Sequence, residues 1–283
     1  MVDESDSEGK YEIDEDGLPR EIVGPWVKDK HARLEKYVGI SRSVRAMFSR
    51  PGGAGASFID LFSGPGRVRI RDEQESRDGG ALVAWHEAVN GGARFTQVHV
   101  ADVNPAFADA VELRLIRDGA PALKQVGEAA DVVDAVVKKL NRYALHFAFL
   151  DPYALKALPF DIIRKLASLQ RMDILVHVSI QDLQRNLRRY IGQEGSPLDS
   201  FAPGWRQHVD VSRSDDLVRA KFLEHWRNLL KAEGMSTTET AELVVGTKNQ
   251  RLYLLAFAAR HDRALEFWEK IRHLDGNQQG TLL

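Results

Sequence analysis

An alternation of short apolar segments with longer amphipathic segments constrains the fold of this chain more than any other feature. Five apolar segments have the length of strands, at residues 57–62, 95–101, 122–126, 146–151 and 173–180. Amphipathic segments between them have the length and apolar spacing of helices, at 105–117, 130–141 and 160–169. Strands joined by helices form a parallel sheet with right-handed crossovers. We therefore predict a Rossmann-like α/β fold with a mostly parallel, doubly wound sheet.

Other segments extend this pattern at both ends of the chain. They are predicted helices at 26–48, 81–89 and 262–273 and predicted strands at 238–245 and 251–259. The first helix is expected to break near Gly39, and the two strands flank Gly246–Gln250 as an antiparallel hairpin. Residues 182–233 contain helical patterns and no convincing strand. We interpret this stretch as a helical insertion or cap.

Negative charge is concentrated at the start of the chain. Residues 1–21 hold nine acids and two bases, a net charge of −7, although the whole chain carries only −2. Because this segment lacks apolar periodicity, we predict a disordered acidic tail at 1–21, followed by a Rossmann domain at 22–283. The remaining charge of +5 is compatible with an anionic partner such as nucleic acid and does not require one.

Composition excludes several kinds of chemistry. The 283 residues include 0 cysteines, so disulfides, thiolate nucleophiles and cysteine-ligated metal centres are ruled out. No apolar run approaches the ~20 residues that span a bilayer, and the acidic N-terminus is unlike a signal peptide. We therefore expect a cytoplasmic protein without a membrane partner. The nine histidines lack metal-ligand spacing, so no metal is expected, and His177 is interpreted as a hydrogen-bonded core residue.

The turn after the first predicted strand, Asp60-Leu61-Phe62-Ser63-Gly64-Pro65-Gly66, is the first candidate site. Gly64 and Gly66 stand where the backbone turns sharply and approaches a ligand, although a plain tight turn is an alternative. The dinucleotide fingerprint fits poorly because Arg69 occupies the place of its third glycine, and a Walker A loop fits worse. A methyltransferase, by contrast, uses an acid such as Asp60 near the methionine end of S-adenosylmethionine. Phe62 lies in the same turn.

Two further acids are candidate cofactor ligands. Asp102 ends the second predicted strand and offers paired acceptors to the two hydroxyls of a ribose. It follows Asp60 by 42 residues, about double the usual ~20, so an enlarged loop must lie between them. A plain helix N-cap is the alternative for Asp102. Glu128, after Gly127, is a candidate contact of the adenine amino group.

Asp151-Pro152-Tyr153 closes the fourth predicted strand, at the edge where doubly wound sheets bind ligands. It resembles the Asp/Asn-Pro-Pro-Tyr/Phe signature of methyltransferases that act on amino groups of bases, with one proline missing. That resemblance implies that Asp151 and a carbonyl of the Pro152 region accept from the target amino group, so that Asp151 orients the nitrogen, and that Tyr153 stacks on the base. A strand-ending Asp-Pro turn without chemistry is the alternative. A basic helix with Arg185, Arg188 and Arg189 is compatible with phosphate contacts or with a solvated face.

Four segments together resemble the three-Cys-motif partner family over about residues 26–275. They are Trp26–Lys30 leading to Leu34 and Tyr37, Phe58–Gly66, Phe149–Tyr153, and Leu252–His261 with Phe267-Trp268. The resemblance implies a class I methyltransferase-like fold, a usually bacterial source and a radical-SAM-like partner protein with three clustered cysteines. Ala154 stands where relatives more often carry glycine.

These residues lead to two hypotheses. In the first, the chain is an S-adenosylmethionine-dependent methyltransferase acting on an amino nitrogen of a nucleic acid base or modified nucleotide. Its cofactor would contact Asp60, Phe62, Gly64, Gly66, Asp102 and Glu128, and its acceptor Asp151, Pro152 and Tyr153. In the second, it is a non-catalytic module that binds nucleic acid or a protein partner on a methyltransferase scaffold. A nuclease finds little support, because no metal-binding acid cluster follows a strand.

Overall fold

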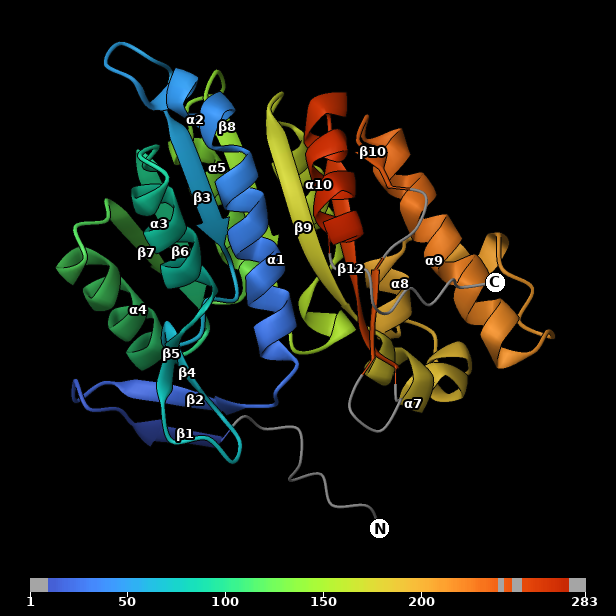
Figure 1. Ribbon diagram of the computed structural model, residues 1–283. Helices are drawn as coiled ribbons and strands as arrows, with labels where there is room; N and C mark the ends of the chain where they lie inside the picture. Colours follow the sequence, from blue (N-terminus) through green and yellow to red (C-terminus); the bar gives the residue numbers. More distant parts are fainter. Residues whose placement is uncertain (1–9, 239–241, 246–250, 275–283) are drawn as a thin grey trace. The chain divides into compact units, whose positions relative to one another are not determined.

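The computed structural model describes residues 10–238, 242–245 and 251–274. The chain divides into two compact units, Met1–Gly127 and Glu128–Leu283 (Figure 1). The sequence predicts one domain over 22–283, whereas the structure divides this range after Gly127.

The first unit contains two sheets. Its strands are β1 (Lys10–Ile13), β2 (Pro19–Val23), β3 (Ala56–Asp60), β4 (Arg67–Ile70), β5 (Ser76–Asp78), β6 (Gln97–Asp102) and β7 (Ala122–Val126). Strands β3, β6 and β7 pair in parallel in that order, which confirms three of the predicted strands. Strands β1, β2, β4 and β5 form a separate small sheet, in which only β2 and β4 are parallel. The small sheet lies beyond the carboxyl ends of β3 and β6 (Figure 1).

Local signals place the helices of the first unit. They are α1 (Val27–Ile40), α2 (Arg42–Ser49), α3 (Gly80–Asn90) and α4 (Pro105–Arg117). Helix α4 has the predicted bounds because Pro105 occupies its first turn and the Asn104 side chain accepts a hydrogen bond from the Ala106 N–H at 3.0 Å. Helix α3 packs on β3 and β6, and α4 packs on β6 and β7. The break between α1 and α2 falls at Ser41, close to the predicted Gly39.

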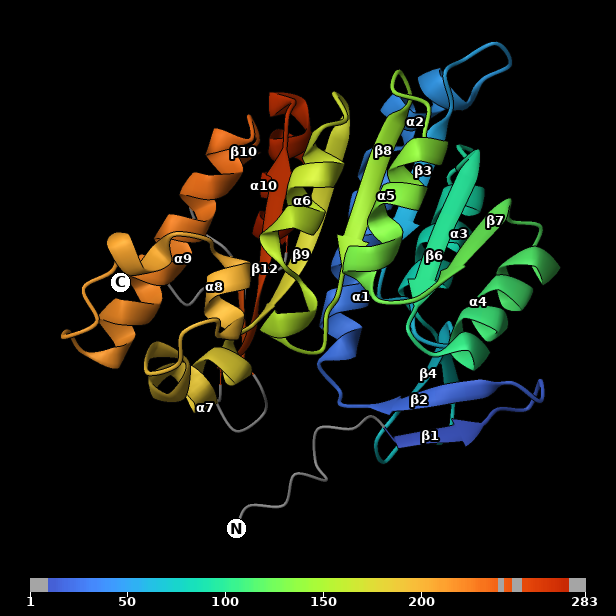
Figure 2. The same ribbon diagram turned by 180° about the vertical axis from the view of Figure 1, so that it is seen from behind.

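The second unit begins with helix α5. Its helices are α5 (Ala129–Lys139), α6 (Phe160–Ala167), α7 (Ile180–Ile191), α8 (Pro197–Phe201), α9 (Asp215–Ala232) and α10 (Asp262–Leu274), with short 3-10 turns at Leu155–Ala157 and Trp205–Gln207. Its strands are β8 (Leu145–Leu150), β9 (Met172–Ser179), β10 (Ser236–Thr237), β11 (Glu242–Val245) and β12 (Arg251–Ala259). Helices α5 and α6 lie side by side (Figure 2). Residues 182–233, all of them described, contain helices and no strand.

Strand pairing in the second unit completes the fold class. Strands β8 and β9 are parallel, and β12 runs antiparallel to β9 and also to β10 and β11. The predicted antiparallel hairpin is therefore present as β11 and β12, while its loop at 246–250 lies outside the described residues. Parallel strands joined by helices, followed by this hairpin, define the predicted α/β Rossmann-like fold of the methyltransferase kind.

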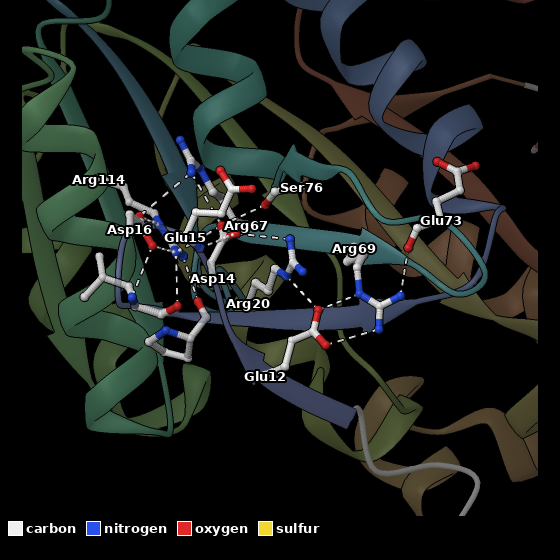
Figure 3. Close-up of polar contacts among 12 residues, drawn as sticks. Glu12, Asp14, Glu15, Asp16, Arg20, Arg67, Arg69, Glu73, Ser76 and Arg114 are labelled. Carbon is white, nitrogen blue, oxygen red and sulfur yellow. Dashed lines mark hydrogen bonds and ion pairs between the residues drawn. The ribbon is translucent and has the colours of Figure 1, made fainter.

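The predicted disordered tail is wrong for residues 10–21. These residues form β1, the following turn and most of β2, while 1–9 lie outside the described residues. Three acids of the segment, Glu12, Asp14 and Asp16, bond arginines of other strands or of α4 (Figure 3). Glu12 bonds Arg20 and Arg69, and Asp14 bonds Arg20 at 3.0 Å. A high local negative charge is therefore neutralised by bases far along the chain.

None of the described helices is both long enough and apolar enough to cross a membrane.

Candidate functional site

The turn after β3 is held by the last residue of that strand. The Asp60 side chain is only 2% exposed, and its Oδ1 accepts a hydrogen bond from the Phe62 N–H at 3.0 Å. Further along the turn, the Ser63 N–H donates to the Ala101 carbonyl of β6 at 3.0 Å. These bonds fix the path of the chain from β3 into the two glycines.

The two glycines of the turn have different surroundings. Both have positive φ, +54° at Gly64 and +86° at Gly66. A Cβ on Gly66 would lie 2.9 Å from Val111 Cγ2 and 3.1 Å from Val111 Cα, so close packing against α4 explains this glycine. A Cβ on Gly64 would have only Glu21 Oε2 within 4 Å, at 3.6 Å. Gly64 is therefore the position where the backbone lies open to a ligand.

Asp102 ties this turn to the end of β6. Its Oδ2 accepts a hydrogen bond from the Gly64 N–H at 3.0 Å, and its Oδ1 accepts one from the Asn104 N–H at 2.8 Å. Burial raises the pKa of Asp102, and these two N–H donors act in the opposite direction. Asn104, not Asp102, is the N-cap of α4, so the alternative interpretation of Asp102 as a helix cap is wrong.

The loop after β7 reaches the same strand end. The Gly127 N–H donates to the Asp102 carbonyl at 3.1 Å, and Gly127 has a φ of +145°. Glu128 follows as the first residue of the second unit, and its side chain is exposed. Its assignment to the adenine amino group stays a prediction.

Two residues beside the turn, Tyr11 and Glu21, were not predicted from the sequence. The Tyr11 ring lies 4.3 Å from the Phe107 ring of α4, measured between centroids, at an interplanar angle of 34°. Burial and the charges of Glu21 and Asp102 raise the pKa of Tyr11. A hairpin signal was present, because alternating polar and apolar residues flank Asp16-Gly17. Because the segment holds so many acids, it was nevertheless predicted to be disordered.

The second unit holds the predicted acceptor residues. Asp151 directly follows β8, and its Oδ1 is hydrogen bonded to Nδ1 of His177 in β9. The His177 ring contacts the ring of the buried Tyr253 edge-on, with 4.3 Å between centroids. His177 is thus hydrogen bonded, as interpreted from the sequence, but it is only partly buried and is not a core residue. Its partner is the candidate catalytic acid. Pro152 is buried, whereas 71% of Tyr153 is exposed.

Asp182 of α7 holds the loop that follows Tyr153. Its Oδ2 accepts from the Leu155 N–H at 3.0 Å, and its Oδ1 accepts from Asn186 Nδ2 and the Tyr190 hydroxyl, both at 2.8 Å. Burial, reinforced by the bond to Asp182, raises the pKa of Tyr190. The loop carrying the candidate acceptor residues is therefore anchored to the first turn of α7.

Replacing Asp182 with alanine is expected to loosen this loop. The Leu155 N–H loses a charged acceptor worth about 1.5–3 kcal/mol, so its amide should exchange with solvent about tenfold faster or more. Tyr190→Phe is the matched control, because it removes a hydrogen bond from Asp182 and leaves the bond to Leu155. Hydrogen exchange resolved at Leu155 checks this, and equal rates in the two variants would contradict it.

The helix predicted to contact phosphate is α7. One of its arginines instead forms hydrogen bonds within the second unit. Arg188 donates to Asp215 at 2.6 Å and to the carbonyls of Val211 and Arg213.

Among the described residues, His, Asp and Glu form no group of three that would hold a metal ion.

No protein-family model and no curated protein matches the sequence, while solved structures that are similar in fold include several methyltransferases. An O-methyltransferase from Bacillus cereus, in complex with S-adenosylhomocysteine, is 13% identical over 84% of this chain and 82% of its own, with a TM-score of 0.46. The O-methyltransferase TomG from Streptomyces achromogenes, in complex with S-adenosylmethionine, is 13% identical over 81% and 79%, with a TM-score of 0.45. The N-methyltransferase NodS from Bradyrhizobium japonicum, in complex with S-adenosylhomocysteine, is 12% identical over 84% and 89%, with a TM-score of 0.39. These likenesses concern the fold and assign this chain no substrate.

Proposed function

We propose that this chain is an S-adenosylmethionine-dependent methyltransferase whose cofactor lies along the turn after β3. The observation that carries the proposal is the bond between the Gly64 N–H and the Asp102 carboxylate. It joins an open, positive-φ glycine to an acid that has acceptor capacity for a ribose diol. Because only Glu21 Oε2 lies within 4 Å of a Cβ added at Gly64, this glycine leaves room beside the turn in which we place the cofactor.

The candidate cofactor contacts of the first unit have distinct roles in this proposal. Asp102 accepts hydrogen bonds from the ribose hydroxyls while its backbone donors keep it in place. The nearly buried Asp60 carries negative charge toward the methionine end, where an ammonium group must be held. Phe62 and Gly64 line the turn between them. When bound, the cofactor supplies an electrophilic methyl group on a sulfonium.

The proposed acceptor is an amino nitrogen of a nucleic acid base or modified nucleotide. The exposed Tyr153 ring offers a face on which a base stacks, an interaction worth about 1–3 kcal/mol. Asp151, held by its bond to His177, accepts an N–H of the target amino group and so orients the target nitrogen. The methylated nitrogen then loses its proton to solvent. The resemblance to the three-Cys-motif partner family supports a radical-SAM-like protein as the partner.

Calorimetry with S-adenosylmethionine and S-adenosylhomocysteine tests the cofactor assignment. We expect both ligands to bind below about 1 mM and Asp102→Ala to weaken binding about 100-fold, because two charge-assisted hydrogen bonds are lost. Asp109→Ala is the matched control, since this acid of α4 is exposed and pairs with Lys124. Thermal unfolding of each variant separates lost binding from lost fold. Absence of binding, or equal binding in Asp102→Ala, would refute the proposal.

A second assay separates the enzyme from a non-catalytic binding module. We expect Asp151→Ala to retain cofactor binding and to lose methyl transfer to RNA, DNA or a modified nucleotide supplied with labelled cofactor. Nucleic acid or partner binding that survives this substitution, in a protein that never transfers a methyl group, would favour the binding module.

A further inference from the structure

The N-terminal hairpin is held rigidly against the turn after β3. The Arg114 guanidinium of α4 is bidentate to Asp16, at 2.8 and 2.7 Å, and donates to the carbonyls of Pro19 and Pro65 at 2.8 and 2.7 Å. Arg114 is only 3% exposed. One buried side chain therefore joins the β1–β2 turn, through the bonds to Asp16 drawn in Figure 3, to the Gly64–Gly66 turn.

This anchoring places two hairpin side chains beside the proposed cofactor ligands. Tyr11 packs on Phe107, which lies in the first turn of α4. Its phenol lies close enough to Asp102 for the charge of that carboxylate to raise the pKa of Tyr11. Glu21 Oε2 is the nearest atom to the open side of Gly64, at 3.6 Å from an added Cβ. Although its ring is packed on Phe107, Tyr11 remains 46% exposed. An aromatic ring that is backed by another ring and still half open is a stacking surface.

We infer that the hairpin β1–β2 forms one wall of the cofactor site, with Tyr11 covering the adenosine portion beside Asp102 and Glu21 facing the cationic portion at Gly64. This inference rests on the proposed function. The Tyr11 ring, already fixed against Phe107, loses little freedom when it stacks on the nucleoside. At neutral pH its hydroxyl remains protonated and is a donor, since burial and two neighbouring acids raise its pKa.

Glu21 would give the site a preference between substrate and product. S-adenosylmethionine carries a sulfonium charge that S-adenosylhomocysteine lacks, so a carboxylate near the ligand favours the former. Asp60 and Asp102 already supply negative charge at the two strand ends, and Glu21 adds a third acid from the hairpin. The preference would help the product to leave after transfer.

Calorimetry on the full chain tests the wall. We expect Tyr11→Ala to raise the Kd for S-adenosylhomocysteine about tenfold, in line with the loss of base–aromatic stacking. Tyr11→Phe should change it less than about threefold, because the ring is kept. Ile13→Ala, a change at a residue of the same strand that is 69% exposed, should leave the Kd unaltered. Glu21→Gln should weaken S-adenosylmethionine about fivefold more than S-adenosylhomocysteine.

Fluorinated tyrosine at position 11 provides a readout that removes no contact. Its ¹⁹F resonance should shift on saturation with S-adenosylhomocysteine. If the native chain binds both ligands and Asp102→Ala weakens binding as expected, while the Kd of Tyr11→Ala and the ¹⁹F resonance are unchanged, the wall is refuted and the proposed function stands. If the native chain binds neither ligand, both fail.

Discussion

Replacing Arg114 with alanine is expected to lower the free energy of unfolding by about 3–5 kcal/mol, the range observed when one partner of a buried ion pair is removed. The substitution leaves the carboxylate of Asp16 and the carbonyls of Pro19 and Pro65 without their buried donor. Because these groups belong to the hairpin and to the turn after β3, binding of S-adenosylhomocysteine should weaken as well. Denaturant unfolding followed by circular dichroism, together with calorimetry, measures both effects.

Arg117 provides the matched control on the same helix. Its side chain is 51% exposed and lies 4.0 Å from Asp16, so Arg117→Ala should change stability by less than about 0.5 kcal/mol. A similar loss in both variants would mean that helix propensity or net charge, rather than the buried anchor, determines the effect. A loss of unfolding free energy below about 1 kcal/mol in Arg114→Ala would contradict the claim that the buried bonds of Arg114 stabilise the fold.

The bonds between Arg114 and Asp16 also predict that the free energy of unfolding depends on pH. The hydrogen bonds from Arg114 lower the pKa of Asp16 from 3.8 to about 2. A carboxyl whose pKa is depressed in the folded protein contributes stability above its unfolded pKa and loses it as the pH falls through the folded pKa. The stability difference between the native chain and Arg114→Ala should therefore be full above pH 4 and shrink toward pH 2. Unfolding curves at pH 7, 4 and 2 check this, and a constant difference would contradict it.

The two glycines of the turn are expected to respond differently to alanine. At Gly66 the φ of +86° and the approach to Val111 Cα at 3.1 Å act together. Left-handed backbone costs about 1–2 kcal/mol for a residue with a Cβ, and overpacking costs about 1–3 kcal/mol more. We therefore expect Gly66→Ala to lower the free energy of unfolding by about 2–5 kcal/mol.

Gly64→Ala is the matched comparison. Its Cβ would meet only Glu21 at ordinary contact distance, so about 1–2 kcal/mol of backbone strain is expected. The Cβ would instead occupy the space proposed for the cofactor and weaken S-adenosylhomocysteine about tenfold or more. Thermal unfolding and calorimetry on both variants measure the two effects. Equal destabilisation with equal binding would show that the turn is purely structural.

Local patterns in the sequence were sufficient for most of the α/β frame. Helix α4 was predicted with its observed bounds because Pro105 and the Asn104 cap are signals within a few residues of its start. Strand β7 was predicted equally well, because a short segment between two helices has little freedom in such a fold. Asp60 and Asp102 were predicted to lie at the same edge of the sheet, because parallel strands end at one edge.

Contacts between distant residues decided the remainder. The small sheet of the first unit was missed because its acids are neutralised from far along the chain, as when Arg114 bonds Asp16 across 98 positions. The bond between Asp151 and His177 joins neighbouring strands 26 positions apart, and no spacing in the sequence reveals it.

The sequence by itself determined the order of the parallel strands and of the helices that join them, the glycine turn and the acids at the strand ends, because periodicity, caps and turn residues act over a few positions. Only the tertiary structure decided that Gly66 packs against α4, that Gly64 is the open position, and that the acidic hairpin lies against the turn. Those features depend on which charged and apolar groups meet once the chain is compact. That choice is made by long-range ion pairing and close packing, for which local sequence carries no signal.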